Sequence, residues 1–122
     1  MLTKKKIPFI GENLNMKNAL KIITQKKLGF LLAKNKRGYT TGIITDGTIR
    51  RANQKTKDLQ NLLVKKIMTR KPLSIGQEML AAKALSLMNS KKITSLCIND
   101  KKNKNKTIGI LHIHNILEAN VQ

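Results

Sequence analysis

The apolar positions in the first half of the chain predict a helix, two strands and a short second helix. Apolar residues between positions 16 and 23 recur with helical spacing. Asn15 precedes them as a good N-cap, and we expect this helix to end near Lys27. Two apolar runs around a glycine-containing turn then predict a hairpin, and a polar turn opens the second helix. These later segments are residues 30–33, 40–44 and 46–52.

The second half of the chain repeats this order of elements. Residues 84–88 line up with 19–23, residues 109–112 line up with 42–45, and Pro72 lines up with Pro8. The chain therefore divides into two copies of about 60 residues each. The copies are residues 1–61 and residues 62–122.

The repeat predicts the remaining elements. We expect residues 101–106 to form a solvated hairpin loop, because their charges keep them out of a core. We expect a polar linker at 54–61, after which 62–68 lead into the second copy. The predicted elements of that copy are a helix at 77–90, strands at 95–99 and 107–111, and a helix at 114–119.

Two small α/β units are the expected architecture. Each unit is a helix–strand–strand–helix with an extended lead-in strand, so the class is α/β or α+β. One unit is too small to bury both faces of its sheet, and we expect the two to pack about a pseudo-two-fold axis. Such packing predicts a cleft lined by strand ends and by helix N-termini, which attract anions.

Composition narrows the classes of function. The 122 residues carry a formal net charge of +19, which invites a nucleic-acid interpretation. However, most of the cations are lysines and only 2% of residues are aromatic, so residues that read or stack on bases are scarce. Cys97 is the single cysteine, and no apolar run is long enough to span a membrane. We expect a soluble, cytoplasmic protein whose main function is not nucleic-acid binding.

Several motifs carry a resemblance to known families. Residues 64–69, with Pro72, 84–88 and 109–111, resemble a CBS (cystathionine-β-synthase) domain, and the doubled unit resembles a CBS pair, or Bateman module. A narrower set of motifs is similar to the C-terminal CBS pair of bacterial arabinose-5-phosphate isomerases. That set comprises residues 7–8, 42–47, 50–52, 68–72, 92–96 and 109–114.

The resemblance implies a regulatory role without catalysis. In that family an N-terminal sugar isomerase (SIS) domain interconverts ribulose 5-phosphate and arabinose 5-phosphate for the synthesis of Kdo and lipopolysaccharide. This chain has no room for such a domain, so we expect no catalytic residues and no cofactor. Met1 aligns with Met68, inside a repeat element, and we therefore expect a fragment of a longer isomerase.

The main ligand candidates are Thr45, Asp46 and Thr48. CBS domains that bind adenosine nucleotides commonly use a Ser/Thr-x-x-Asp pattern, whose acid accepts hydrogen bonds from ribose hydroxyls. Here the acid position is Thr48, and its counterpart in the second copy is Asn115. Both lack the charge that strengthens such hydrogen bonds. Plain N-capping of a helix explains Thr45 and Asp46 equally well.

Other candidates lie close to these in sequence. His112 and His114 project the same way from an extended segment; with no other metal-ligating residue nearby, we interpret them as polar lining of the cleft and not as a metal site. Arg50 either binds an anion or is solvated, and at most one of Arg50 and Arg51 faces the cleft. The resemblance also implies backbone contacts to a ligand at the start of each hairpin. These second-rank positions are Gly29, Phe30, Thr94 and Ser95.

Three hypotheses follow. The first is a sensor of an anionic nucleotide or nucleotide sugar, for which CMP-Kdo, the activated end product of the pathway, is the sensible feedback ligand. The second is a structural module that pairs with another CBS pair as a homodimer and organises a tetramer of the enzyme. The third, less favoured, is nucleic-acid binding.

Overall fold

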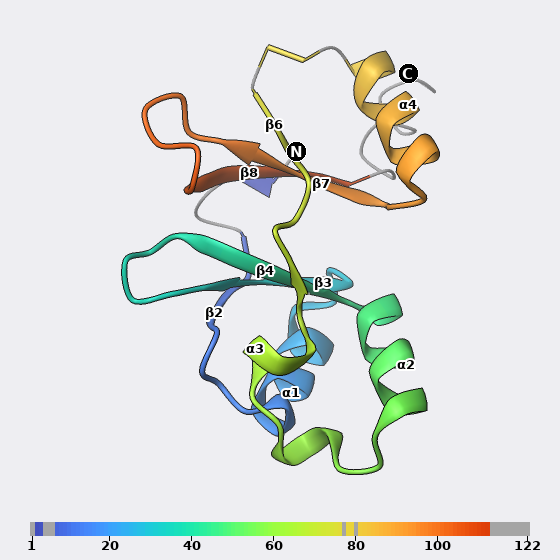
Figure 1. Cartoon of the computed structure of the whole chain (residues 1–122). Helices are drawn as coiled ribbons and strands as arrows, with labels where there is room; N and C mark the ends of the chain where they lie inside the picture. Colours follow the sequence, from blue (N-terminus) through green and yellow to red (C-terminus); the bar gives the residue numbers. More distant parts are fainter. Residues whose placement is uncertain (1, 4–6, 77, 80, 113–122) are drawn as a thin grey trace. The chain divides into compact units, whose positions relative to one another are not determined.

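The helices and strands of the chain divide between two units. The structure is a computed structural model, and it describes residues 2–3, 7–76, 78–79 and 81–112 (Figure 1). The first unit comprises residues 8–72, and the second comprises residues 1–7 with 73–122. The first unit contains β2 (Phe9–Gly11), α1 (Met16–Lys26), β3 (Phe30–Lys34), β4 (Thr40–Thr45), α2 (Asp46–Lys55), the short 3-10 helix η1 (Leu59–Asn61), α3 (Val64–Ile67) and β5 (Thr69–Arg70). The second contains β1 (Leu2–Thr3), β6 (Ser74–Ile75), α4 (Ala81–Lys91), β7 (Ser95–Asn99) and β8 (Thr107–His112).

The N-cap and the C-terminal end predicted for α1 are confirmed. The side chain of Asn15 accepts a hydrogen bond of 2.9 Å from the backbone N–H of Asn18. At the other end Lys27 adopts a left-handed conformation with φ of 55° and closes the helix. The apolar stripe of α1, which includes Met16 and Ile23, is buried. Local spacing and capping therefore fix both ends of this helix.

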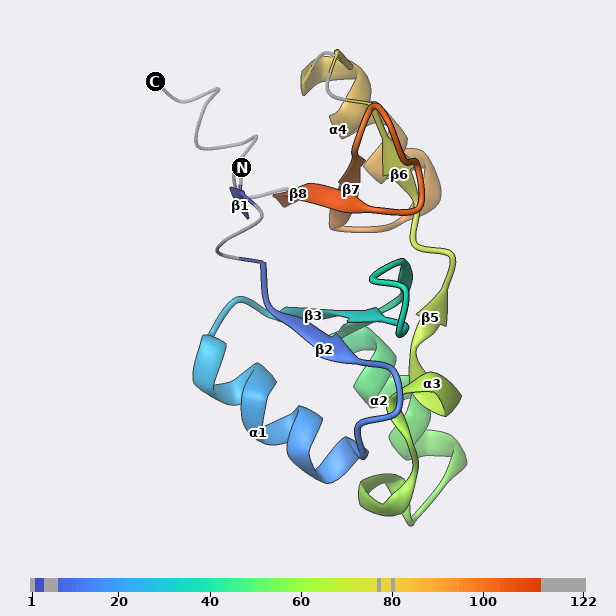
Figure 2. The ribbon, with the colours of Figure 1, turned by 90° about the vertical axis from the view of Figure 1, so that its left-hand side faces the viewer.

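The sheet of the first unit has the strand order β2-β3-β4-β5. β2 runs parallel to β3, whereas β3 with β4 and β4 with β5 are antiparallel. The helices α1, α2 and α3 all lie on one face of this sheet (Figures 1 and 2). Residues 30–33 of β3 are at most 2% exposed, which agrees with the continuous apolar run of this strand.

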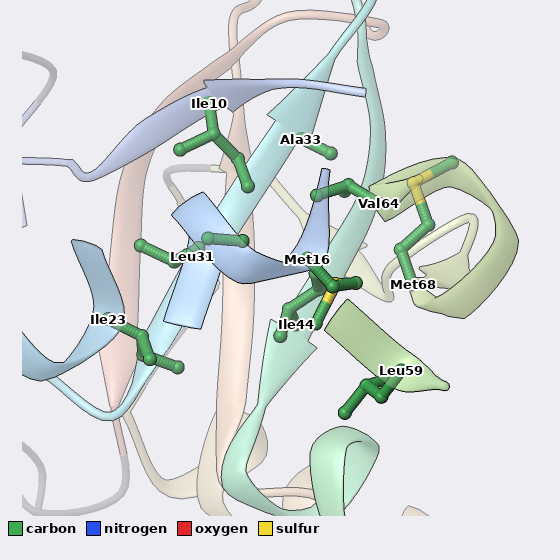
Figure 3. Close-up of a cluster of buried hydrophobic side chains, with 10 residues drawn as sticks. Ile10, Met16, Ile23, Leu31, Ala33, Ile44, Leu59, Val64 and Met68 are labelled. Carbon is green, nitrogen blue, oxygen red and sulfur yellow. The ribbon is translucent and has the colours of Figure 1, made fainter. Parts of the chain in front are cut away.

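The core of the first unit lies between α1 and the sheet. Figure 3 shows Met16 of α1 beside Ile44 of β4. Val64 of α3 and Met68, which follows α3, belong to the same cluster. Met16 and Val64 are fully buried, and Ile44 is 1% exposed. Full burial of each such side chain stabilises the fold by roughly 1.5–3 kcal/mol.

The sheet of the second unit has the order β1-β8-β7-β6 and repeats the register of the first. In β3 and β4, Phe30 pairs with Thr45, and the register shifts between Ala33 and Lys34. In β7 and β8, Ser95 pairs with His112, and the register shifts at the equivalent place, between Ile98 and Asn99. The internal repeat and the α/β class with two small, helix-flanked sheets are thus confirmed.

The polar segment predicted as a linker at 54–61 is mostly exposed, but it includes the end of α2, the 3-10 helix η1 and one buried residue. Helix α2 continues to Lys55, and η1 follows after a short turn. Leu59 of η1 is 5% exposed and belongs to the core of the first unit, as do Val64 and Met68. Polar neighbours concealed Leu59 in the sequence, and the segment 59–68 covers one side of α1 instead of merely connecting the copies.

Among the described residues, the second copy departs from its predicted elements at the start of one helix. The helix expected from residue 77 begins at Ala81, because the preceding chain turns where the N–H of Met79 donates to the carbonyl of Gly76. The strands at 95–99 and 107–111 are confirmed, as is the exposed loop between them. The helix predicted at 114–119 lies outside the described residues.

Each sheet receives one strand from the beginning of the other repeat. Leu2 and Thr3 of β1 pair with Ile110 and Gly109 of β8 (Figure 2). Equivalently, residues 69 and 70 of β5 pair with residues 43 and 42 of β4. The units therefore divide the chain after residues 7 and 72, whereas the repeats predicted at 1–61 and 62–122 divide the sequence. None of the helices that the structure describes has the length and apolarity needed to cross a membrane.

Candidate anion-binding site

A capping box joins the end of β4 to the start of α2. The Thr45 hydroxyl accepts a hydrogen bond of 3.2 Å from the N–H of Thr48, and the N–H of Thr45 donates to the Thr48 hydroxyl at 3.1 Å. The two hydroxyl oxygens also lie 3.1 Å apart. Thr48 is 5% exposed. These threonines therefore fix the start of α2.

The capping box limits what Thr45 and Thr48 can offer a ligand. A hydroxyl has one donor proton and two acceptor lone pairs. Each of the two hydroxyls already accepts a backbone N–H, and one hydroxyl proton is used between them. Thr45 thus acts as a helix cap, and one hydroxyl proton of the pair remains for another partner.

Other predicted residues of the first copy gather at the same end of the sheet. Phe30 pairs with Thr45 across β3 and β4. A Cβ placed on Gly29, whose φ is +81°, would lie 4.0 Å from Oδ2 of Asp46. The Phe30 side chain is buried, so this residue can offer a ligand only its backbone groups.

The equivalent end of the second sheet is described only in part. Ser95 of β7 pairs with His112 of β8, and Thr94 directly precedes Ser95. The Ser95 hydroxyl is buried and has no hydrogen-bond partner among the residues that the structure describes. His114 and Asn115 lie outside the described residues.

A pocket of about 310 Å³ lies in the first unit between α2 and the segment from residue 62 to residue 69. Three of its side chains are cations, three carry hydroxyls and three are aliphatic. These are Arg51, Lys55 and Lys66; Thr48, Thr56 and Thr69; and Ala52, Leu62 and Ile67. No carboxylate stands among these nine lining residues, all of which the structure describes. The pocket therefore offers positive charge and hydroxyl groups beside an apolar surface, a combination suited to an organic anion.

Of the two adjacent arginines, Arg51 is the one that lines the pocket. Both guanidinium groups turn back over the first turn of α2. A Cβ placed on Gly47 would lie 3.1 Å from Nη1 of Arg51 and 3.8 Å from Nη2 of Arg50. The absence of a side chain at Gly47 leaves room for Arg51 above the helix N-terminus, where an anion is also favoured by the helix dipole.

Sequence reasoning did not select Arg51, Lys55 or Lys66 as site residues. Helical spacing could have indicated the first two, because positions 48, 51 and 55 share one face of a helix. Lys66 comes from α3, which packs on α2. No local pattern connects Lys66 with that face.

No cluster of three potential metal ligands among histidine, cysteine, aspartate and glutamate occurs in the described part of the chain. Cys97 lies in β7 and is 2% exposed. Burial raises the pKa of its thiol from 9.0 to about 11, and a hydrogen bond with Thr107 opposes part of that rise. The predicted burial of Cys97 within a strand is confirmed, and burial with a raised pKa makes a thiol a weak nucleophile.

Comparison with solved structures identifies the fold. The CBSX2 protein in complex with AMP is 21% identical, with a TM-score of 0.86 over 100% of this chain and 92% of that chain. The CBS domain pair of MJ0100, in complex with 5′-methylthioadenosine and S-adenosyl-L-methionine, is 19% identical, with a TM-score of 0.81 over 99% of this chain and 96% of that chain. Residues 64–121 match the model of the CBS domain family. The chain has the fold of a CBS-domain pair.

Particular relatives are similar along nearly the whole chain. The arabinose 5-phosphate isomerase KdsD of Yersinia pestis is 34% identical over 99% of this chain and 36% of its own length. KdsD of Escherichia coli K12 is 32% identical over the same shares. The uncharacterized protein RP505 of Rickettsia prowazekii is 37% identical over 94% of this chain and 34% of its own length. The chain thus spans about a third of these relatives and resembles the CBS region of KdsD.

Proposed function

We propose that this chain is the regulatory CBS pair of a cytoplasmic arabinose-5-phosphate isomerase and senses an anionic nucleotide or nucleotide sugar. Catalysis belongs to a separate SIS domain that interconverts ribulose 5-phosphate and arabinose 5-phosphate in the Kdo pathway of lipopolysaccharide synthesis. CMP-Kdo, a late product of that pathway, is the ligand we favour. The similarity to KdsD along 99% of the chain supports the parent activity.

The pocket in the first unit is the observation that carries the sensing role. Arg51, Lys55 and Lys66 line one pocket together with three hydroxyl groups and no carboxylate. Such a lining favours a phosphate or carboxylate through charge-assisted hydrogen bonds. Its aliphatic side accepts an apolar part of the same ligand. The complexes of CBSX2 with AMP and of MJ0100 with 5′-methylthioadenosine and S-adenosyl-L-methionine are consistent with small-molecule binding by this fold.

Thermal unfolding tests the sensing role directly. A ligand that binds only the folded state raises the unfolding temperature by mass action. We expect CMP-Kdo, and more weakly CMP, to raise the melting temperature, and we include AMP and ATP as alternative ligands. No shift with any of the four at millimolar concentration rejects the sensing role. Regulation further requires that the ligand prefer one arrangement of the CBS pair, which an isomerase assay of the complete enzyme measures.

A structural role is the second candidate, and the capping box favours it. Thr45 and Thr48 use most of their hydrogen-bonding capacity within the protein, and neither Thr48 nor Asn115 supplies the carboxylate of nucleotide-binding CBS domains. In this case the chain pairs with a second copy as a homodimer and contributes to a tetramer of the enzyme. Light scattering that shows a ligand-independent dimer, together with no thermal shift, supports this role. A monomer under the same conditions excludes it.

A further inference from the structure

Two of the three cations of the pocket, Arg51 and Lys55, align with uncharged or acidic residues in the second repeat. In the alignment of the two repeats, Ala52 corresponds to Ala119. Arg51 therefore corresponds to Glu118, and Lys55 corresponds to Gln122. The second repeat thus has an acid where the first has its arginine, and an uncharged amide where the first has a lysine.

The pocket of the first unit has the chemistry of a phosphate site. The guanidinium of Arg51 lies over Gly47, at the positive end of the α2 dipole. Lys55 stands one helical turn further along the same face, and Lys66 approaches from α3. Like charges gathered in one pocket repel one another, and a phosphate group between them converts that repulsion into attraction. The planar guanidinium group of an arginine can also donate hydrogen bonds to two phosphate oxygens at once.

The size and the apolar side of the pocket restrict the ligand further. A volume of about 310 Å³ is near the lower end of small-molecule sites. Leu62 and Ile67 provide an aliphatic surface, so a hydrophobic or planar group can lie there while the phosphate contacts the cations. A nucleotide with a single phosphate group, such as AMP or the CMP part of CMP-Kdo, combines these properties.

We propose that each chain binds one phosphate-bearing nucleotide, in the first repeat only, through Arg51, Lys55 and Lys66. This inference rests on the sensing role proposed above and deepens it, because it assigns the residues and the stoichiometry. The one-site stoichiometry rests on the aligned sequences, in which the second repeat has glutamate at the position of Arg51 and glutamine at the position of Lys55.

Titration calorimetry of the purified chain tests the proposal. The probes are CMP-Kdo and AMP at low salt, with adenosine as the uncharged control. We expect a stoichiometry near one and no binding of adenosine. Arg51→Glu, which installs the charge of the second repeat, should weaken probe binding by roughly tenfold or more, because it removes a charge-assisted contact and adds repulsion. Lys55→Gln should weaken binding several-fold.

Arg37→Glu is the matched control, since it makes the same charge change at an exposed turn in the same unit. It should bind the probe as the natural chain does. Circular-dichroism melts verify that each variant is folded, and Lys55→Gln remains informative if Arg51→Glu does not fold. Binding by the natural chain that Arg51→Glu and Lys55→Gln leave unchanged, or a stoichiometry of two, overturns the one-site proposal while sensing stands. Binding of neither probe overturns the one-site proposal, and the four-ligand thermal test decides whether the sensing role falls with it.

Discussion

At the scale of single residues, Gly42 lies in β4 where a side chain has no room. A Cβ at this position would collide with the side chain of Met68, which the core holds in place. Overpacking of this kind costs about 1–3 kcal/mol. We therefore expect Gly42→Ala to lower the free energy of unfolding by that amount, as measured by urea denaturation.

Gly11→Ala is the control for this prediction. A Cβ on Gly11 meets no atom within 4 Å, and its backbone does not require glycine. The substitution should leave the free energy of unfolding unchanged or raise it slightly, since alanine restricts the unfolded chain. Equal losses at both glycines would contradict a steric role for Met68.

Because the thiol of Cys97 is buried, we expect the free energy of unfolding to depend on pH. Its folded-state pKa of about 11 lies above the ordinary value of 9.0, so the folded protein keeps the thiol proton where the unfolded chain releases it. This contribution is complete below pH 9 and disappears as the pH rises toward 11. We expect the natural chain to lose about 2–3 kcal/mol more than Cys97→Ala across this interval, since one pKa unit corresponds to about 1.4 kcal/mol.

Urea denaturation of the natural chain and of Cys97→Ala at pH 8 and pH 11 measures this difference. The lysines and the tyrosine are present in both proteins, so their contributions to the pH dependence cancel in the comparison. Parallel curves for the two proteins would show that the buried thiol does not contribute.

At the scale of elements, the segment after α2 behaves as part of the core. Leu59 in η1 is 5% exposed and packs in the same cluster as Val64 and Met68. Leu59→Ala should therefore cost about 2–5 kcal/mol through lost burial and the cavity left behind. The neighbouring exposed Gln60 provides the comparison, and Gln60→Ala should change the free energy of unfolding by about 0.5 kcal/mol or less. Similar small effects at both positions would restore the linker interpretation.

The elements also show how far local patterns reach. Helix α1 was predictable at both ends, because its N-cap at Asn15 and its apolar spacing are properties of neighbouring residues. The start of α2 was predictable for the same reason, since Thr45 and Thr48 satisfy each other's backbone groups within one turn. The role of Leu59 was not predictable, because its burial depends on α1, more than 30 positions earlier in the chain.

At the scale of the whole molecule, the exchange of β1 and β5 joins the two repeats. Deleting residues 1–3 removes β1 and leaves Gly109 and Ile110 of β8 at an open sheet edge. Adjacent residues of a strand direct their N–H groups to opposite sides, so one of these two faces β1 and the other faces β7. We expect faster amide hydrogen exchange at the residue that faces β1 and a loss on the order of 1–2 kcal/mol, because its backbone pairing with β1 is gone. Hydrogen exchange followed by NMR checks this residue by residue.

The equivalent pair Gly42 and Ile43 serves as the internal control, because these residues pair with β5 and not with β1. Their protection should not change. If Gly109 and Ile110 keep their protection after the deletion, the pairing of β1 with β8 is wrong.

The sequence by itself determined the repeat, the order of the elements, the capping residues and the likeness to the CBS pair of an isomerase. These properties reside in spacing and in short motifs, which neighbouring residues specify. Only the tertiary structure decided that β1 and β5 cross between the repeats and that Leu59 enters the core. It likewise decided that Lys66 meets Arg51 and Lys55 in one pocket. Each of these depends on contacts between residues far apart in the chain, and no local periodicity encodes them.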